Sequence, residues 1–183
     1  MCCDRAVTDP RDDTAQVRSV AEQLASAGAA FVRGRRAEVF GAEFSNGDAV
    51  RTKSTPTDPV TVVDTETEAL LRRRLAELRP GDAVLGEEGG GPADAVAAGA
   101  VTWVLDPIDG TVNFVYGIPV YAVSVAAQVD GISVAGAVVD VVSGEIYSAG
   151  RGLGAHMTDA DGRRALRCTD VTELSMALVG TGF

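Results

Sequence analysis

The chain has 183 residues, of which 46% are hydrophobic and 23% are charged, a composition typical of a globular domain rather than a disordered chain. Its 26 acidic and 16 basic residues give a formal net charge of −10, which opposes binding to a nucleic-acid backbone or to an anionic membrane surface. With no apolar run long enough to span a membrane, one histidine and three cysteines, the sequence predicts a cytoplasmic protein without a disulfide framework or a multi-histidine metal site.

The first helix is predicted from the spacing of apolar residues near the start of the chain. Residues 1–13 are polar and irregular, and we expect a flexible tail there. From Thr14 to about Arg35, valine, leucine and phenylalanine recur every three or four positions, which predicts one amphipathic helix. The segment 36–52 has no clear period, and two prolines hold the segment 53–59 extended.

A second helix is predicted to begin at a capping signal. Thr61 and Asp64 fit the pattern in which a hydroxyl and an acidic side chain three residues later satisfy backbone N–H groups at a helix start. Asp64 would then lie in the first turn, where the helix dipole stabilises a carboxylate. Its apolar stripe is expected to consist of Leu71, Leu75 and Leu78. A Pro-Gly pair at 80–81 ends the helix.

The rest of the chain has the shorter period of β-strands. Strands are predicted over residues 83–85, 101–105, 119–129, 132–142, 145–149, 154–157, 164–168 and 177–179. Asp130-Gly131 predicts a tight hairpin between two of them. Because helices come first and hairpin-linked strands follow, we expect an α+β fold, with two N-terminal helices packed on a mainly antiparallel sheet. The chain stops directly after an apolar strand, so we expect it to be the front part of a longer protein.

The segment D-P-I-D-G-T at 106–111 carries the clearest chemical signal. Asp106 and Asp109 follow a predicted strand, and the proline and glycine restrict the turn so that both carboxylates and a backbone carbonyl can face one point. Oxygen ligands of this kind suit Mg²⁺. The backbone N–H groups of Gly110 and Thr111, at the start of a short helix, would offer a neighbouring phosphate site. Taken alone, such a turn is more often structural than catalytic.

Together with two upstream motifs, this segment resembles the inositol monophosphatase family. Three motifs stand in the order typical of that family: K-S-T-P-T-D-P-V-T-V-V-D at 53–64, G-E-E at 86–88 and W-V-L-D-P-I-D-G-T-V-N-F at 103–114. Their sequences are most similar to those of its actinobacterial members. The resemblance implies that residues 14–183 form an N-terminal metal-binding α+β domain. This domain would be the front part of the layered αβαβα sugar-phosphatase fold, whose C-terminal part is absent from this chain.

The resemblance also implies a role for each matching residue. The metal ligands would be Glu87, Asp106, the carbonyl of Ile108 and Asp109. The catalytic groups, which orient a metal-activated water, would be Glu87, Thr111 and Asp64. The substrate phosphate would be held at Asp109, Gly110 and Thr111. Two further residues, Lys53 and Glu88, would support the site from just outside the metal ligands.

The implied activity is hydrolysis of inositol 1-phosphate to myo-inositol and phosphate, with two or three Mg²⁺ ions per site and inhibition by lithium. The implied partners are a small phosphorylated polyol and a second copy of the chain in a homodimer, with no nucleic acid and no membrane. Other substrates of the same superfamily stay open, namely fructose 1,6-bisphosphate, histidinol phosphate and adenosine 3′,5′-bisphosphate. So does a non-catalytic metal-binding fragment, because the later half of the family fold supplies a further metal ligand. We therefore expect this chain alone to be weakly active or inactive.

Overall fold

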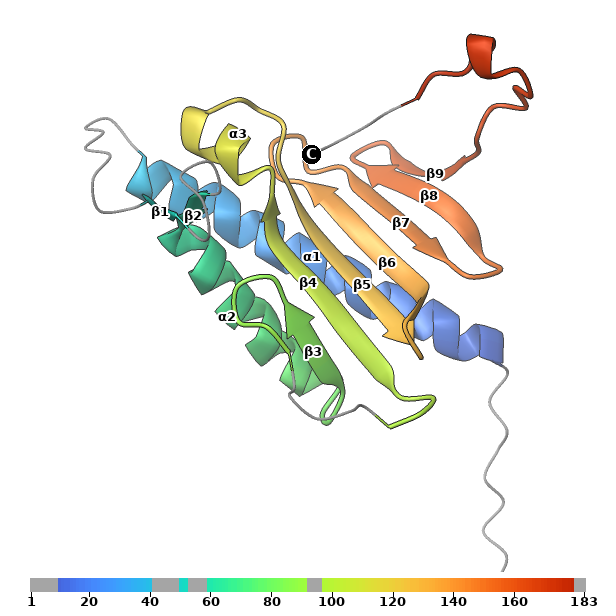
Figure 1. The fold of residues 1–183 in the computed structure, drawn as a ribbon, viewed down its shortest axis with the longest axis horizontal. Helices are drawn as coiled ribbons and strands as arrows, with labels where there is room; N and C mark the ends of the chain where they lie inside the picture. Colours follow the sequence, from blue (N-terminus) through green and yellow to red (C-terminus); the bar gives the residue numbers. More distant parts are fainter. Residues whose placement is uncertain (1–9, 41–49, 53–58, 92–96, 180–183) are drawn as a thin grey trace, which may run out of the picture.

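The fold is a layer of two helices laid across one face of a large sheet, as a computed structural model shows for residues 10–40, 50–52, 59–91 and 97–179 (Figure 1). The sheet has the strand order β3-β4-β5-β6-β7-β8-β9. The long helix α1 contacts β5, β6 and β7, while α2 contacts α1 and β4. This arrangement confirms the predicted α+β fold. Within the described ranges, no helix is long and apolar enough to cross a bilayer.

Helix α1 spans Pro10–Val39 and supplies much of the core. It begins four residues before the predicted start at Thr14, and its first residue is a proline, whose missing N–H is no loss at that position. Residues 1–9, the greater part of the predicted tail, lie outside the described residues. The side chains that it buries against the sheet and α2 are mostly small or branched: Val17, Ala21, Leu24, Ala25, Ala29 and Val32.

Helix α2 spans Val62–Leu78 and begins with the predicted capping box. The Thr61 hydroxyl accepts hydrogen bonds from the backbone N–H groups of Val63 and Asp64, at 3.2 and 3.4 Å. The Thr61 N–H in turn donates to the Asp64 carboxylate at 2.9 Å, so the helix start is fixed by one reciprocal pair. Leu71 and Leu75 are buried as predicted, whereas Leu78 is 42% exposed.

The sheet is mainly antiparallel, as predicted. Its strands are β3 Ala83–Gly86, β4 Val101–Asp109, β5 Ala122–Val129, β6 Ile132–Asp140, β7 Ile146–Gly150, β8 Gly154–Asp159 and β9 Gly162–Leu166. Strand β3 pairs with β4 in parallel, and every other neighbouring pair in this described sheet is antiparallel. The β5–β6 hairpin turns at Asp130 and Gly131 with φ of 51° and 75°, the left-handed pair that a type I′ turn requires.

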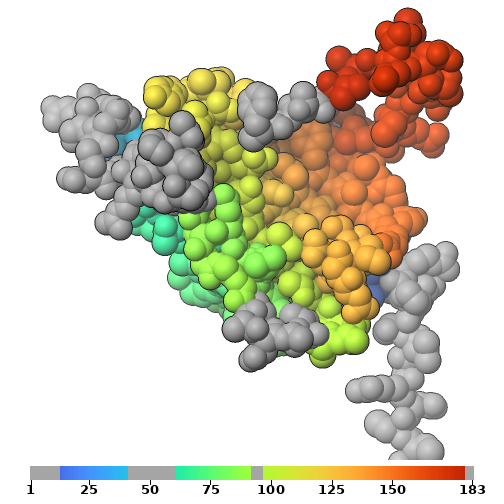
Figure 2. All heavy atoms as spheres, viewed as in Figure 1, coloured from blue at the N-terminus to red at the C-terminus, as the bar shows by residue number. Residues whose placement is uncertain are grey.

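Three sequence predictions about strands need correction. A two-stranded sheet of β1 (Val50–Thr52) and β2 (Pro59–Thr61) was missed, because each strand is only three residues long. Strand β4 continues past Asp106 to Asp109, with a break in register between these residues. The predicted strand at 177–179 is wrong: a 3₁₀ turn, η1 (Leu174–Met176), precedes an exposed irregular segment. None of the described strands pairs with that segment, and Figure 2 shows the chain after β9 projecting from the molecule.

A short helix, α3 (Thr111–Tyr116), follows β4 directly and is anchored by one aromatic side chain. Phe114 is fully buried and packs edge-on against Phe40 and Tyr121, with ring centroids 5.3 and 5.4 Å apart. The Arg36 side chain of α1 donates a hydrogen bond to the Phe114 carbonyl at 3.2 Å. These contacts fix the position at which the chain leaves β4, and hence the segment that carries Asp106–Thr111.

Candidate active site

Parallel pairing of β3 with β4 brings the Gly-Glu-Glu motif to the end of β4. The backbone N–H of Glu87 donates to the carbonyl of Leu105 at 3.1 Å, which extends the pairing one residue beyond β3. A tight turn follows, in which the Gly86 N–H donates to the Gly90 carbonyl at 2.9 Å. Glu87 therefore lies beside Asp106, although Asp106 comes 19 positions later in the sequence.

Asp106 lies in an environment that disfavours its negative charge. It is half-buried, and its Oδ1 has no hydrogen-bond partner among the described residues. Burial, followed by the charge and hydrogen bonding of Glu87 and by the charge of Asp109, raises the pKa of Asp106 to about 7, against a small opposing effect of a hydrogen bond from the Ile108 backbone. The charged side chains that act most strongly on Asp106, Glu87 and Asp109, are both acidic.

A divalent cation fits this acidic cluster. Glu87 and Asp106 are in contact, and Asp109, exposed at the end of β4, is near enough to act through its charge. In the described part of the chain, no three acidic, histidine or cysteine side chains already converge closely enough to enclose an ion. A buried carboxylate oxygen without a hydrogen-bond donor, next to a second carboxylate, is nevertheless what an oxygen-ligated Mg²⁺ site presents without its metal.

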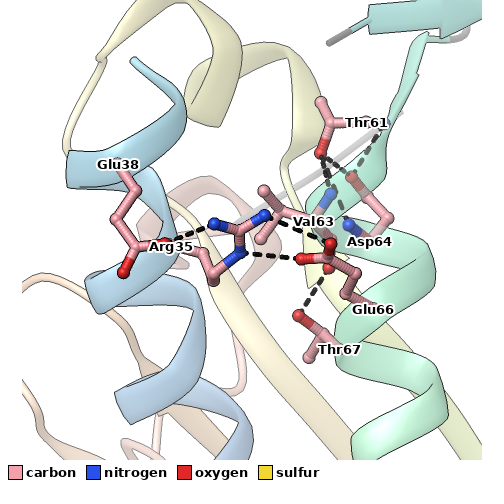
Figure 3. A network of polar contacts seen from close by, with 7 residues as sticks. All are labelled: Arg35, Glu38, Thr61, Val63, Asp64, Glu66 and Thr67. Atoms are coloured by element: carbon pink, nitrogen blue, oxygen red, sulfur yellow. Dashed lines mark hydrogen bonds and ion pairs between the residues drawn. The ribbon is translucent and has the colours of Figure 1, made fainter. Parts of the chain in front are cut away.

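Thr111 and Asp64, two of the predicted catalytic residues, are hydrogen-bonded to each other in the structure. The Thr111 hydroxyl lies 3.1 Å from Oδ1 of Asp64 and 2.9 Å from the carbonyl oxygen of Ile108. Asp64 is fully buried, and its Oδ2 accepts the Thr61 hydroxyl at 2.5 Å as well as the Thr61 N–H (Figure 3). Burial raises the pKa of Asp64, and the hydrogen bonds from Thr61 and Thr111 oppose that rise. The carbonyl of Ile108 keeps a second lone pair for a cation.

Three predicted site residues remain: Gly110, Glu88 and Lys53. Gly110 joins β4 to α3, and its carbonyl accepts the Phe114 N–H at 2.9 Å. Glu88 lies in the turn after β3, and its backbone N–H is held by the Glu68 carboxylate at 2.8 Å. Lys53 lies outside the described residues.

Gly110 occupies a position where a side chain would be costly. Its φ is 91°, and a Cβ built there would lie 3.0 Å from the carbonyl oxygen of Val120. We expect Gly110→Ala to destabilise the protein by about 2–3 kcal/mol in urea denaturation, because strain and a clash add. Gly131→Ala is the control, since Gly131 has φ of 75° but open space around it, and it should cost only about 1 kcal/mol. Equal losses in both variants would contradict the close contact at Gly110.

Two ion pairs that sequence reasoning did not single out support the site from α2. Arg35 of α1 grips Glu66 with two hydrogen bonds, of 2.7 and 3.1 Å, and also contacts Glu38 (Figure 3). This pair ties α1 to the first turns of α2, next to Asp64. One turn further along α2, Glu68 pairs with Arg72 at 2.7 Å and contacts the turn that carries Glu87.

The fold is shared with solved structures of the SuhB type. The structure of Mycobacterium tuberculosis SuhB matches with a TM-score of 0.72 and 63% identity, over 90% of this chain and 56% of that one. A SuhB structure from Bartonella henselae matches with a TM-score of 0.71 and 29% identity, over 85% of this chain and 55% of that one. The predicted layered architecture, helices on a mainly antiparallel sheet, is thus confirmed.

Sequence comparison identifies the family. The model described as the inositol monophosphatase family matches residues 13–183, and the chain belongs to this family. The Mycobacterium tuberculosis protein named inositol-1-monophosphatase SuhB is 70% identical over 181 residues, which are 97% of this chain and 62% of the relative. A Pseudomonas aeruginosa relative named Nus factor SuhB is 40% identical over 126 residues, or 69% of this chain and 45% of its own. The chain thus spans about three fifths of the length of the mycobacterial relative.

Proposed function

We propose that the protein is a Mg²⁺-dependent phosphomonoesterase that hydrolyses inositol 1-phosphate to myo-inositol and phosphate. The observation that carries the proposal is geometric: Asp106 contacts Glu87, and its buried Oδ1 has no hydrogen-bond partner among the described residues. Five positions later, Thr111 is hydrogen-bonded to the buried Asp64. Membership of the family supports a phosphatase that acts on small phosphorylated compounds, and the name of the 70% identical relative supports inositol 1-phosphate as the substrate.

In this proposal the cations, two or three of them, are held by Glu87, Asp106, Asp109 and the carbonyl of Ile108. When bound at these residues, Mg²⁺ would supply the positive charge that attracts a dianionic phosphate to this acidic protein and the Lewis acidity that makes a water more nucleophilic. The acidic side chains would repel the substrate if they stood alone, because the chain carries a net charge of −10.

The side chains next to the metal ligands would handle the proton and orient the substrate. The Thr111 hydroxyl lies 3.1 Å from Oδ1 of Asp64, so Thr111 would pass its own proton to Asp64 as it takes one from the attacking water and would itself stay neutral. We further propose that Glu87 shares this role, and that Asp109 and the backbone N–H groups of Gly110 and Thr111 hold the phosphate. Glu88 and Lys53 are proposed to support the ligands.

Magnesium should raise the melting temperature of the chain by several degrees, because it binds the folded site and not the unfolded chain. The measurement is a thermal denaturation series from zero to millimolar Mg²⁺ at pH 8. Asp161→Asn serves as the control, since it removes one exposed carboxylate outside the site and should leave the magnesium response intact. A melting temperature that does not change in millimolar Mg²⁺ would contradict the metal site.

The activity itself is tested by phosphate release from inositol 1-phosphate, with and without Mg²⁺ and lithium. Because the chain spans only part of its relatives, the assay is run on this chain and on a chimera completed with the remaining part of the Mycobacterium tuberculosis relative. We expect Mg²⁺-dependent, lithium-inhibited release in the chimera and little release from the chain alone. If both bind Mg²⁺ and neither releases phosphate from any substrate, the alternative of a non-catalytic metal-binding protein is correct.

A substrate panel separates inositol 1-phosphate from the other substrates of the superfamily. Fructose 1,6-bisphosphate, histidinol phosphate and adenosine 3′,5′-bisphosphate are compared by kcat/KM, and a higher value for any of them would replace the proposed substrate. We also propose a cytoplasmic homodimer, on the family resemblance, which sedimentation analysis of the chimera would test. The name Nus factor stays with the Pseudomonas aeruginosa relative, because no observation on the described residues favours such a role here.

A further inference from the structure

We propose that Glu68 is a positioning residue, whose buried carboxylate holds the turn after β3 and thereby orients Glu87 toward Asp106. The proposal rests on the proposed function, because it takes Glu87 as a metal ligand. The hydrogen bonds that Glu68 makes in the described part of the chain go to Arg72 and to the backbone N–H groups of Glu88 and Gly89, so it would act through the backbone of the turn.

Glu68 binds two successive backbone groups of that turn. Its side chain is only 4% exposed. One carboxylate oxygen, Oε2, accepts the Glu88 N–H at 2.8 Å, and the other, Oε1, accepts the Gly89 N–H at 3.0 Å. Hydrogen bonds from backbone N–H groups to an ionised carboxylate are stronger than those between neutral groups. The two bonds immediately follow Glu87 and fix the orientation of the peptide units on its C-terminal side.

Arg72, one helical turn further along α2, binds both Glu68 and the same turn. Its Nε donates to Oε1 of Glu68 at 2.7 Å, which compensates the buried negative charge. A second nitrogen of the same guanidinium donates to the carbonyl of Gly90 at 2.6 Å. Glu68 and Arg72, named here the turn clamp, therefore bind both the N–H groups and a carbonyl of the residues that follow Glu87.

Two glycines near Glu87 leave space for the Glu68 carboxylate because they have no side chain. A Cβ built at Gly86 would lie 2.3 Å from Oε1 of Glu68, and one built at Gly89 would lie 2.7 Å from the same oxygen. A side chain at either position would displace Glu68. We therefore attribute the glycines at these two positions to the close approach of the Glu68 carboxylate. Gly110 differs, because its backbone has a left-handed conformation and theirs does not.

The clamp also explains how an exposed side chain can form part of an ordered site. Glu87 is exposed, and its side chain contacts Asp106. The Glu87 backbone is held on one side by the bond to Leu105 and on the other by Glu68. Loss of the hydrogen bonds to Glu68 would leave the fold intact but would give Glu87 more positional freedom relative to Asp106. Residues that orient metal ligands typically change metal affinity by 10–100-fold when they are replaced.

Glu68→Gln tests the proposal with almost no change in side-chain volume. The amide nitrogen cannot accept a backbone N–H, and the charge that pairs with Arg72 is lost. We expect hydrogen exchange at the Glu88 and Gly89 amides of the metal-free chain to become at least about 10-fold faster. Mg²⁺ affinity, measured by calorimetric titration, should fall by about 10-fold or more. Glu77→Gln, which removes an exposed charge paired with Arg74 on the same helix, should change neither quantity.

A second variant tests the same contact by a substitution in the turn after β3 and leaves the sequence of α2 unchanged. Gly89→Ala should displace the Glu68 carboxylate and weaken Mg²⁺ binding to a similar degree. In a Glu68→Ala background the nearest remaining atom is Nη2 at the end of the flexible Arg72 side chain, 3.2 Å away, so Gly89→Ala should then cause little further loss of Mg²⁺ affinity. If Glu68→Gln fails to fold, Gly89→Ala still carries the test, because additive losses in this cycle would overturn the clamp.

The outcomes separate this inference from the proposed function. Wild-type Mg²⁺ affinity in Glu68→Gln, or unchanged exchange at both amides, would overturn the positioning role while leaving the metal site in place. If the wild-type chain itself binds no Mg²⁺, the proposed function fails. Faster exchange at the Glu88 and Gly89 amides in Glu68→Gln would still support the clamp in that case.

Discussion

Asp106→Asn should abolish Mg²⁺ binding and lower phosphate release by at least about 10³-fold, yet raise the melting temperature of the metal-free chain above pH 7. The two effects have one cause. Burial and the neighbouring Glu87 and Asp109 raise the pKa of Asp106 from its ordinary 3.8 to about 7, so its ionised form weakens the metal-free fold. Asparagine keeps the shape and an acceptor for the Ile108 N–H but carries no charge.

The pH dependence gives the sign of this effect. Between about pH 4 and pH 7 the folded protein keeps a proton on Asp106 that the unfolded chain has lost, so this group's contribution to stability falls as the pH rises. The melting temperature of Asp106→Asn minus that of the wild type should therefore grow over this window and level off above it. Mg²⁺ affinity of the wild type should rise over the same window, because the cation competes with the proton.

Thermal denaturation from pH 4 to pH 8, without and with Mg²⁺, measures both effects. Asp161→Asn is the control, because it lies in the exposed β8–β9 turn and should follow the wild-type profile. A variant that is less stable than the wild type at pH 8 in the absence of metal would show that Asp106 is not under the electrostatic strain described above. Undiminished Mg²⁺ binding would remove Asp106 from the set of ligands.

Thr111→Ala should lower kcat by about 10²–10³-fold in the active form of the protein while leaving Mg²⁺ affinity nearly unchanged. Its hydroxyl is within hydrogen-bonding distance of both Asp64 and the carbonyl of Ile108, and no other described side chain links these two acceptors. The capping box between Thr61 and Asp64 remains in the variant, so α2 still begins correctly.

Thr111→Ser restores the hydroxyl and is the matched control for this variant. We expect it to recover most of the lost kcat in steady-state phosphate release, because the hydrogen bond to Asp64 can form again. If the alanine variant turns over at the wild-type rate, or the serine variant is as slow as alanine, Thr111 has no part in the chemistry. A parallel loss of Mg²⁺ affinity would instead give it a role in holding the site together.

Periodicity and turn chemistry in the sequence were sufficient to predict most of the fold. The i, i+3 and i+4 spacing located α1 and α2, the Thr61–Asp64 capping pair located the start of α2, and Asp130-Gly131 located a hairpin. Local periodicity does not predict the structure of short or unpaired segments, because that structure depends on residues distant in the sequence. The three-residue strand β1 pairs with β2, which local periodicity cannot reveal, and the apolar residues 177–179 form no strand although their composition is typical of one.

The candidate site was predicted only where its residues follow one another in a recognisable motif. Glu68 was missed because a lone glutamate four residues before an arginine looks like an ordinary ion pair on a helix surface. Its position was nevertheless informative. Asp64, Glu68, Leu71 and Leu75 follow one another at intervals of four, three and four residues, so both acidic side chains lie on the buried face of α2. An acidic residue in an apolar stripe is costly unless it has a partner elsewhere in the fold.

The parallel contact between β3 and β4 has a consequence for folding kinetics. Parallel strands need a long crossover, and pairings between distant segments form slowly. Until β3 docks on β4, Glu87 and Asp106 are not neighbours, and the chain offers a cation no preformed binding site. In the proposed protein, Mg²⁺ would therefore lengthen the lifetime of the native state by slowing its unfolding, and would do little to hasten the search that leads to it.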